Sequence, residues 1–150
     1  MKNILPKSAL ISLSDKTNLD LLVSFLLERN VEIISTGGTY KAIKKITNNV
    51  MEVSEYTGHK EMMGGRVKTL HPKIHAGILA RRGEDTDILK SMDYKEIDIV
   101  VVNLYPFEET INSGCSFEEA IEQIDIGGPT MIRAAAKNFK DVLVLSDPSD

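Results

Sequence analysis

Apolar residues along this chain follow two periods, one typical of buried strands and one typical of amphipathic helices. Short apolar runs predict strands over residues 8–13, 31–35, 50–53, 97–102 and 142–145. Apolar residues at helical spacing predict helices between these runs. The predicted helices cover residues 19 to about 30, a stretch that includes 40–46, and a stretch from 72 through 79. Further helices are predicted over 84–92, in the segment that follows 116–119, and from after 129 to about 138. A capping box at residues 116–119 precedes the helix that carries Phe117, Ala120, Ile121 and Ile124 on one face.

Strands that alternate with helices predict a mostly parallel sheet with helices on both faces, the doubly wound, Rossmann-like three-layer α/β class. A chain of 150 residues suits one domain with an adequate core. The last predicted strand ends near Leu145, and no helix follows to cover it. We therefore expect residues 1–150 to be a domain truncated at its C-terminal end.

The composition narrows the function classes. A net charge of -4 argues against a general nucleic-acid binder. No apolar run is long enough to cross a bilayer, and the N-terminal residues make a poor signal peptide. The single cysteine, Cys115, cannot form an internal disulfide. A cytoplasmic location, without a nucleic-acid or membrane partner, is the resulting expectation.

Residues 64–75 concentrate cations, imidazoles and a hydroxyl in twelve positions that begin with a Gly-Gly pair. The pattern predicts a turn, then a short extended run, then a helix that starts at Pro72. In an extended run Arg66 and Lys68 point the same way, toward an anionic group. The alternative is a solvated basic loop.

Three polar motifs directly follow predicted strands, at 14–16, at 36–39, and at Asn103 and Tyr105. In an open parallel sheet these positions share one edge, where ligands bind. Gly37 and Gly38 open a helix, so their N–H groups suit a phosphate, with Lys16 as a nearby cation. Neither a Gly-x-Gly-x-x-Gly nor a Walker A pattern is present, which disfavours NAD and ATP.

Four further residues have competing interpretations. His71 and His75 have a spacing that can bind metal on a helix, but no third ligand is evident, and local hydrogen bonds are the favoured role. Asp125 precedes Gly127 and Gly128, as a helix-capping aspartate does. Lys137 stands near the end of the following helix, where a cation complements the helix C-terminus. The pattern alone favours these structural roles.

Seven motifs together resemble one family, the bifunctional purine biosynthesis proteins, in their N-terminal IMP cyclohydrolase domain. The motifs are Ser-Asp-Lys-Thr at 14–17, Thr-Gly-Gly-Thr at 36–39, residues 64–72, 75–80, Asn-Leu-Tyr-Pro-Phe at 103–107, 122–128 and 133–138. The resemblance covers the chain from Ala9 onward and implies a methylglyoxal-synthase-like fold. It implies closure of the purine ring of 5-formamidoimidazole-4-carboxamide ribotide to IMP, without cofactor or metal. The family's transformylase domain is absent from these residues, and a homodimer is expected by analogy.

The resemblance also implies roles for individual residues. It matches Lys68, Tyr105, Asp125 and Lys137 to the residues implicated in catalysis. It matches a second set to substrate binding, and the first six of these residues would hold the phosphate. The base and ribose would be lined by Arg66, Lys68, Thr69, Asn103, Asp125 and Ile126. The second set is Ser14, Lys16, Thr36, Gly37, Gly38 and Thr39, together with Asp15, Arg66, Val67, Thr69, Asn103 and Ile126.

Two other activities use the same fold and stay open as alternatives. One is a methylglyoxal synthase-type lyase, which eliminates phosphate. The other is a regulatory domain that binds a nucleotide and does no chemistry. Both would use a phosphate-binding turn like 36–39, but neither predicts the combination of the motifs at 66–69, 103–107 and 125–128.

Overall fold

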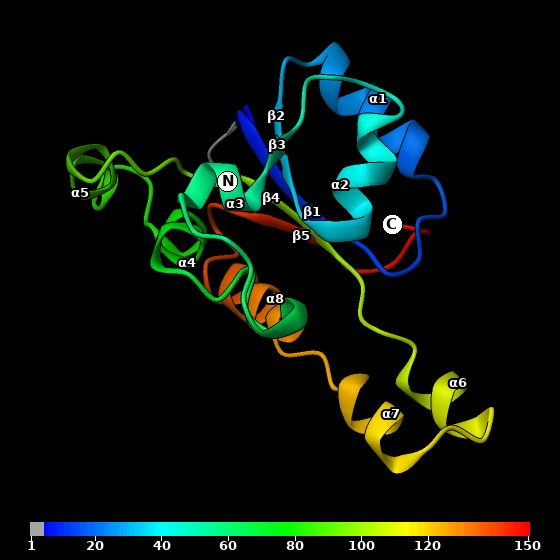
Figure 1. The fold of residues 1–150 in the computed structure, drawn as a ribbon. Helices are drawn as coiled ribbons and strands as arrows, with labels where there is room; N and C mark the ends of the chain where they lie inside the picture. Colours follow the sequence, from blue (N-terminus) through cyan, green and yellow to red (C-terminus); the bar gives the residue numbers. More distant parts are fainter. Residues whose placement is uncertain (1–4) are drawn as a thin grey trace.

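The computed structural model describes residues 5–150, which form a five-stranded parallel sheet between two layers of helices (Figure 1). The strands are β1 Ser8–Ser12, β2 Glu32–Ser35, β3 Met51–Glu52, β4 Ile99–Val102 and β5 Leu143–Leu145. Each of them pairs in parallel with its neighbours. The predicted doubly wound α/β fold is therefore confirmed.

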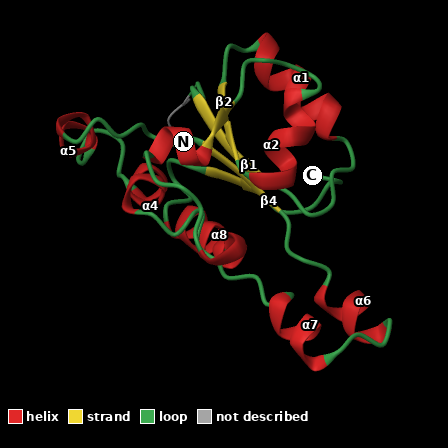
Figure 2. Cartoon of the chain, in the orientation of Figure 1, coloured by secondary structure: helices red, strands yellow, loops and turns green. Residues whose placement is uncertain are grey.

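Side chains alternate across the sheet, and each face has its own core. In β1, Leu10 points into one apolar cluster, while Ala9 and Ile11 point into the other. Helices α1 (Leu19–Glu28) and α2 (Gly37–Lys44) cover the second cluster. Helices α3 (Val53–Thr57), α4 (Pro72–Leu79) and α8 (Gly127–Lys137) cover the first. Figure 2 shows the strands between these two layers.

The strand order, β3-β2-β1-β4-β5, indicates where a ligand would bind without reference to any motif. The chain winds outward in one direction from β1 to β3, then returns to the other side of β1 and continues to β5. The order therefore reverses between β1 and β4. In open α/β sheets, ligands bind in the crevice outside the carboxyl ends of the strands at such a reversal.

Two short helices, α6 (Phe107–Asn112) and α7 (Phe117–Glu122), form a hairpin that projects from the body of the molecule (Figure 1). The predicted capping box is present, because Ser116 accepts from the N–H of Glu119 and the Glu119 carboxylate accepts from the N–H of Ser116. The apolar face that we expected on this helix is not packed. Phe117 is 76% exposed, and neither helix has a buried residue.

Local differences from the predicted elements concern short segments. The third strand is only Met51–Glu52, because Val53 begins α3, which the pattern did not predict. The 3-10 turn Met63–Gly65 replaces part of the expected turn, and Arg66 has helical backbone angles (φ -64, ψ -26). The prediction that Arg66 and Lys68 share an extended run is therefore wrong. Helix α5 (Thr86–Ser91) lies within its predicted range. No helix among residues 5–150 is long and apolar enough to cross a bilayer.

Candidate functional site

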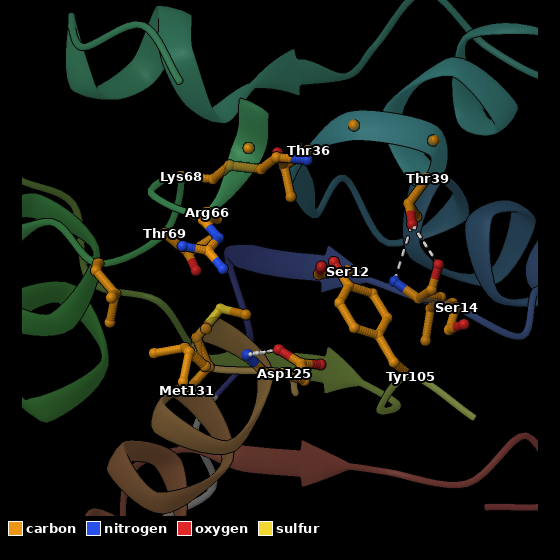
Figure 3. Close-up of a pocket in the computed structure, with 18 of the residues that line it drawn as sticks. Ser12, Ser14, Thr36, Thr39, Arg66, Lys68, Thr69, Tyr105, Asp125 and Met131 are labelled. Atoms are coloured by element: carbon orange, nitrogen blue, oxygen red, sulfur yellow. Dashed lines mark hydrogen bonds between the residues drawn. The ribbon is translucent and has the colours of Figure 1, made fainter. Parts of the chain in front are cut away.

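A cavity of about 770 Å³ lies at the carboxyl ends of β1 and β4, where the strand order reverses. Most of the residues that the sequence pattern and the resemblance selected line it. They are Ser14, Lys16, Thr36, Gly37, Gly38, Thr39, Arg66, Lys68, Thr69, Asn103, Tyr105, Asp125 and Ile126. Figure 3 labels ten of the lining residues and shows Lys68, Arg66 and Thr69 facing Ser14 and Tyr105 across the pocket. The predicted motifs thus meet at one edge of the sheet.

The start of α2 has the features of an anion site. Gly37 has a left-handed conformation (φ 56) that an L side chain rarely adopts, and it lets the chain turn from β2 into the helix. The first-turn N–H groups of a helix have no acceptor within the helix. Lys16 lies beside Gly38, with its Nζ donating to the carbonyls of Leu13 and Ser14 at 3.1 and 3.2 Å. An ammonium group and a helix N-terminus therefore meet at this end of the cavity.

Thr39 and Asn103 tie the loops of this end together. The buried Thr39 hydroxyl accepts from the N–H of Leu13 at 2.8 Å and donates to the Leu13 carbonyl at 2.9 Å. The Asn103 side chain accepts from the N–H groups of Ser14 and Asp15 at 2.7 and 3.1 Å, and donates to the Asp15 carbonyl at 2.7 Å. Asn103 therefore holds the loop after β1 against the end of β4, in addition to lining the cavity.

The two cations of the 64–75 stretch that line the cavity, Arg66 and Lys68, are each paired with a glutamate. Lys68 Nζ lies 3.4 Å from a carboxylate oxygen of Glu61, and it also passes close to Gly37. Arg66 Nη2 donates to Glu122 Oε1 at 2.6 Å. The second pair joins this loop to the end of α7. Both cations thus line the cavity with their charge already balanced.

Asp125 and the start of α8 form the opposite wall. Asp125 Oδ1 accepts from the N–H of Gly128 at 2.9 Å, which confirms the expected hydrogen bond of this aspartate at the helix start. A Cβ on Gly128 would lie 2.5 Å from Asp125 Oδ2, and one on Gly127 would lie 2.6 Å from Thr69 Oγ1. These glycines let the carboxylate and the Thr69 hydroxyl approach the helix backbone. Tyr105 lies in the same region of the pocket (Figure 3).

Of the two histidines of the stretch, His71 caps α4 and His75 lies within it. His71 Nδ1 accepts from the N–H of Lys73 at 3.0 Å and so caps the helix. Burial and the nearby His59 lower the pKa of His71, which favours the neutral imidazole that this acceptor role needs. Burial also lowers the pKa of His75, and a hydrogen bond to the Thr69 backbone partly offsets this. His71 thus makes the local hydrogen bond that its sequence position suggested.

Three residues of the predicted set do not line the cavity. The Asp15 carboxylate turns to Thr17, accepting from its N–H and hydroxyl at 2.9 and 2.7 Å, and these bonds lower the pKa of Asp15. Val67 bridges to Met62 in a short antiparallel contact. Lys137 is exposed at the far end of α8, while the cavity is lined by Gly127, Gly128 and Met131 of that helix. Helix α8 therefore leads away from the cavity of its own chain.

Several lining residues were not in the predicted set. They are Ser12, Leu13, Met63, Gly64, Gly65, Leu70, Ile121, Glu122, Ile124, Gly127, Gly128 and Met131. The glycines lie inside motifs that drew attention for other reasons. Ser12 and Leu13 end the first strand, so the edge rule could have included them. Glu122 lies in the 122–128 motif, but nothing in the pattern gave it or Met131 a site role. Both reach the cavity through the placement of α7 and α8.

Comparisons with known proteins agree with this geometry. A family model described as "MGS-like domain" matches residues 19–130. A solved structure titled "Crystal structure of ForH" is similar at 36% sequence identity with a TM-score of 0.81. The alignment covers 97% of this chain and 75% of ForH. The match to the family model spans well over half of the chain, and the chain therefore belongs to the MGS-like domain family.

Proposed function

We propose that this domain is an IMP cyclohydrolase, which closes the purine ring of 5-formamidoimidazole-4-carboxamide ribotide with loss of water. One observation carries the proposal. A single cavity joins a candidate phosphate site, Lys16 with the start of α2, to Lys68, Tyr105 and Asp125. Its volume of about 770 Å³ suits a nucleotide-sized ligand, because pockets for drug-sized molecules run from roughly 300 to 1,000 Å³.

The proposed reaction has two stages. In the first, the carboxamide nitrogen attacks the formyl carbon, loses one proton, and the formyl oxygen becomes a hydroxyl group. In the second, the hydroxyl takes up a proton and leaves as water while the formamido nitrogen loses its hydrogen, giving the C=N bond of IMP. A cavity that holds both groups in reacting contact can contribute about 7–11 kcal/mol toward such a ring closure.

The residues of the cavity have matching capacities. Lys68 and Tyr105 are donors for the formyl oxygen as it gains negative charge. Asp125 is a carboxylate that can accept the proton of the attacking nitrogen. Lys137 lies outside the cavity of its own chain. Its proposed catalytic role therefore requires a homodimer in which the lysine reaches the neighbouring chain's cavity.

The test is an absorbance assay for IMP formed from the formylated ribotide. We expect IMP to appear with the wild-type chain and to be lost in Asp125→Asn, which keeps the size of the side chain but removes the base. The same family assignment is compatible with a methylglyoxal synthase-type lyase, so dihydroxyacetone phosphate is offered in parallel. Methylglyoxal production, or nucleotide binding without any turnover, would overturn the proposal.

A further inference from the structure

The cations that line the cavity fall into two classes. Lys16 hydrogen-bonds to the carbonyls of Leu13 and Ser14, and no carboxylate among residues 5–150 forms an ion pair with it. Arg66 and Lys68 are each paired with a glutamate. A phosphate is therefore favoured at the Lys16 end. At the Arg66 end the charge is balanced, which suits an uncharged acceptor such as a carbonyl oxygen.

Arg66 and Glu122 are joined by two side-chain hydrogen bonds. Nη2 donates to Oε1 at 2.6 Å, and Nε donates to Oε2 at 3.4 Å. This arrangement occupies one edge of the planar guanidinium, which has five N–H donors in a fixed fork. No hydrogen bond from Nη1 occurs within the described part of the chain. The guanidinium points into the pocket (Figure 3), and the edge that Glu122 does not occupy stays free for a ligand.

We propose that Glu122 is a positioning residue, which holds Arg66 by one edge and presents the other edge to a carbonyl oxygen of the ligand. The inference rests on the proposed function, because that function supplies a ligand with a phosphate at one end and a carbonyl-bearing base at the other. Without Glu122, the long and exposed Arg66 side chain has to be ordered by the ligand itself. That ordering lowers affinity.

The same contact makes the α6–α7 hairpin part of the binding site. Neither helix buries a residue, and in the described chain the Arg66–Glu122 pair is the side-chain hydrogen bond that links this hairpin to the rest of the molecule. Glu122 is the last residue of α7 and also lines the cavity. The position of the hairpin and the orientation of Arg66 are therefore coupled through one side chain.

The experiment compares two glutamates of the same helix. Glu122→Ala removes this contact, and Glu122→Gln keeps one acceptor oxygen. Glu118→Ala is the matched control, because it removes an exposed carboxylate that forms no ion pair among residues 5–150. We expect Glu122→Ala to raise the Kd of IMP about three- to ten-fold, the cost of ordering one long side chain. Glu122→Gln should have a smaller effect and Glu118→Ala none. The Kd of ribose 5-phosphate, which lacks the base, should stay within about two-fold in all three variants.

Two further results decide the matter. In an Arg66→Ala background, Glu122→Ala should weaken IMP binding no further, because the residues act as one unit. The proposal is overturned if Glu122→Ala binds IMP as tightly as Glu118→Ala or more tightly, if IMP and ribose 5-phosphate weaken equally, or if the two substitutions are additive. Binding requires no turnover. A chain that binds IMP in this pattern without forming it would sink the proposed function and leave the role of Glu122 standing.

Discussion

The hydroxyl of Thr39 joins the start of α2 to the end of β1, so its removal tests the frame on which the site is built. Thr39 is 2% exposed and exchanges two hydrogen bonds with the backbone of Leu13. Thr39→Val keeps the shape of the side chain and deletes both bonds. The Leu13 carbonyl retains the Lys16 ammonium at 3.1 Å, whereas the Leu13 N–H has no other partner among residues 5–150.

The expected loss of stability comes from this one N–H group, which Thr39→Val leaves without an acceptor. A buried group left without its hydrogen bond costs about 1–3 kcal/mol of stability, and the partly buried Leu13 N–H belongs at the lower end of this range. For a domain of this length, each kcal/mol lowers Tm by roughly 2–4 °C, so we expect a fall of roughly 2–12 °C. Thr39→Ser keeps the hydroxyl and loses one methyl group, which costs about 0.8 kcal/mol.

Urea unfolding followed by circular dichroism measures the stability difference, and hydrogen exchange of the Leu13 amide identifies its origin. Protection of that amide should fall in Thr39→Val and persist in Thr39→Ser. A Thr39→Val protein as stable as wild type, with Leu13 still protected, would refute the reasoning. It would mean that water or a shifted backbone replaces the hydroxyl without loss.

Three further predictions concern charged groups. Lys16→Ala should weaken binding of IMP more than binding of inosine, as measured by calorimetry, and equal losses would argue against a phosphate role. The Asp85 carboxylate should titrate with a pKa of about 2, because its hydrogen bonds from Arg81 favour the ionised form. Its contribution to stability is therefore complete above about pH 4 and lost as the pH falls toward 2. A carboxyl NMR titration with a midpoint near 4 would contradict this. Lys137→Ala should reduce turnover far more than IMP affinity, and near-normal turnover would leave Lys137 as a helix-end cation.

The fold was predictable because four of its five strands coincide with apolar runs that are too short for a typical helix. Residues 97–102 illustrate this, with Ile99–Val102 fully buried as β4. Gly37 and Gly38 mark the turn after β2 in the same direct way. Once the strands were placed in a parallel sheet, the carboxyl edge collected the motifs that follow them. This inference needed only the chain order and the chirality of the crossovers.

What the sequence could not predict depends on pairs of residues far apart in the chain. Arg66 and Glu122 are 56 positions apart, and Asn103 bonds to Ser14 across 89 positions. The buried ion pair of Arg82 with Asp98 is likewise invisible to periodicity. Helical periodicity in residues 117–124 correctly indicated a helix there, but it also suggested a packing face. The structure leaves that face exposed, because the hairpin projects from the body.

The two ends of the cavity therefore differ in rigidity. The Lys16 end rests on a buried threonine hydroxyl and on three bonds of Asn103, all anchored to the ends of central strands. The Arg66 end rests on an exposed ion pair with a helix that buries nothing, and exposed pairs contribute only about 0–1 kcal/mol. A ligand that spans both ends would find one half preorganised and would itself order the other. Substrate discrimination should consequently depend on the Arg66 end. There, the free energy spent on ordering the side chain is offset to a degree that depends on the contacts each ligand forms with it.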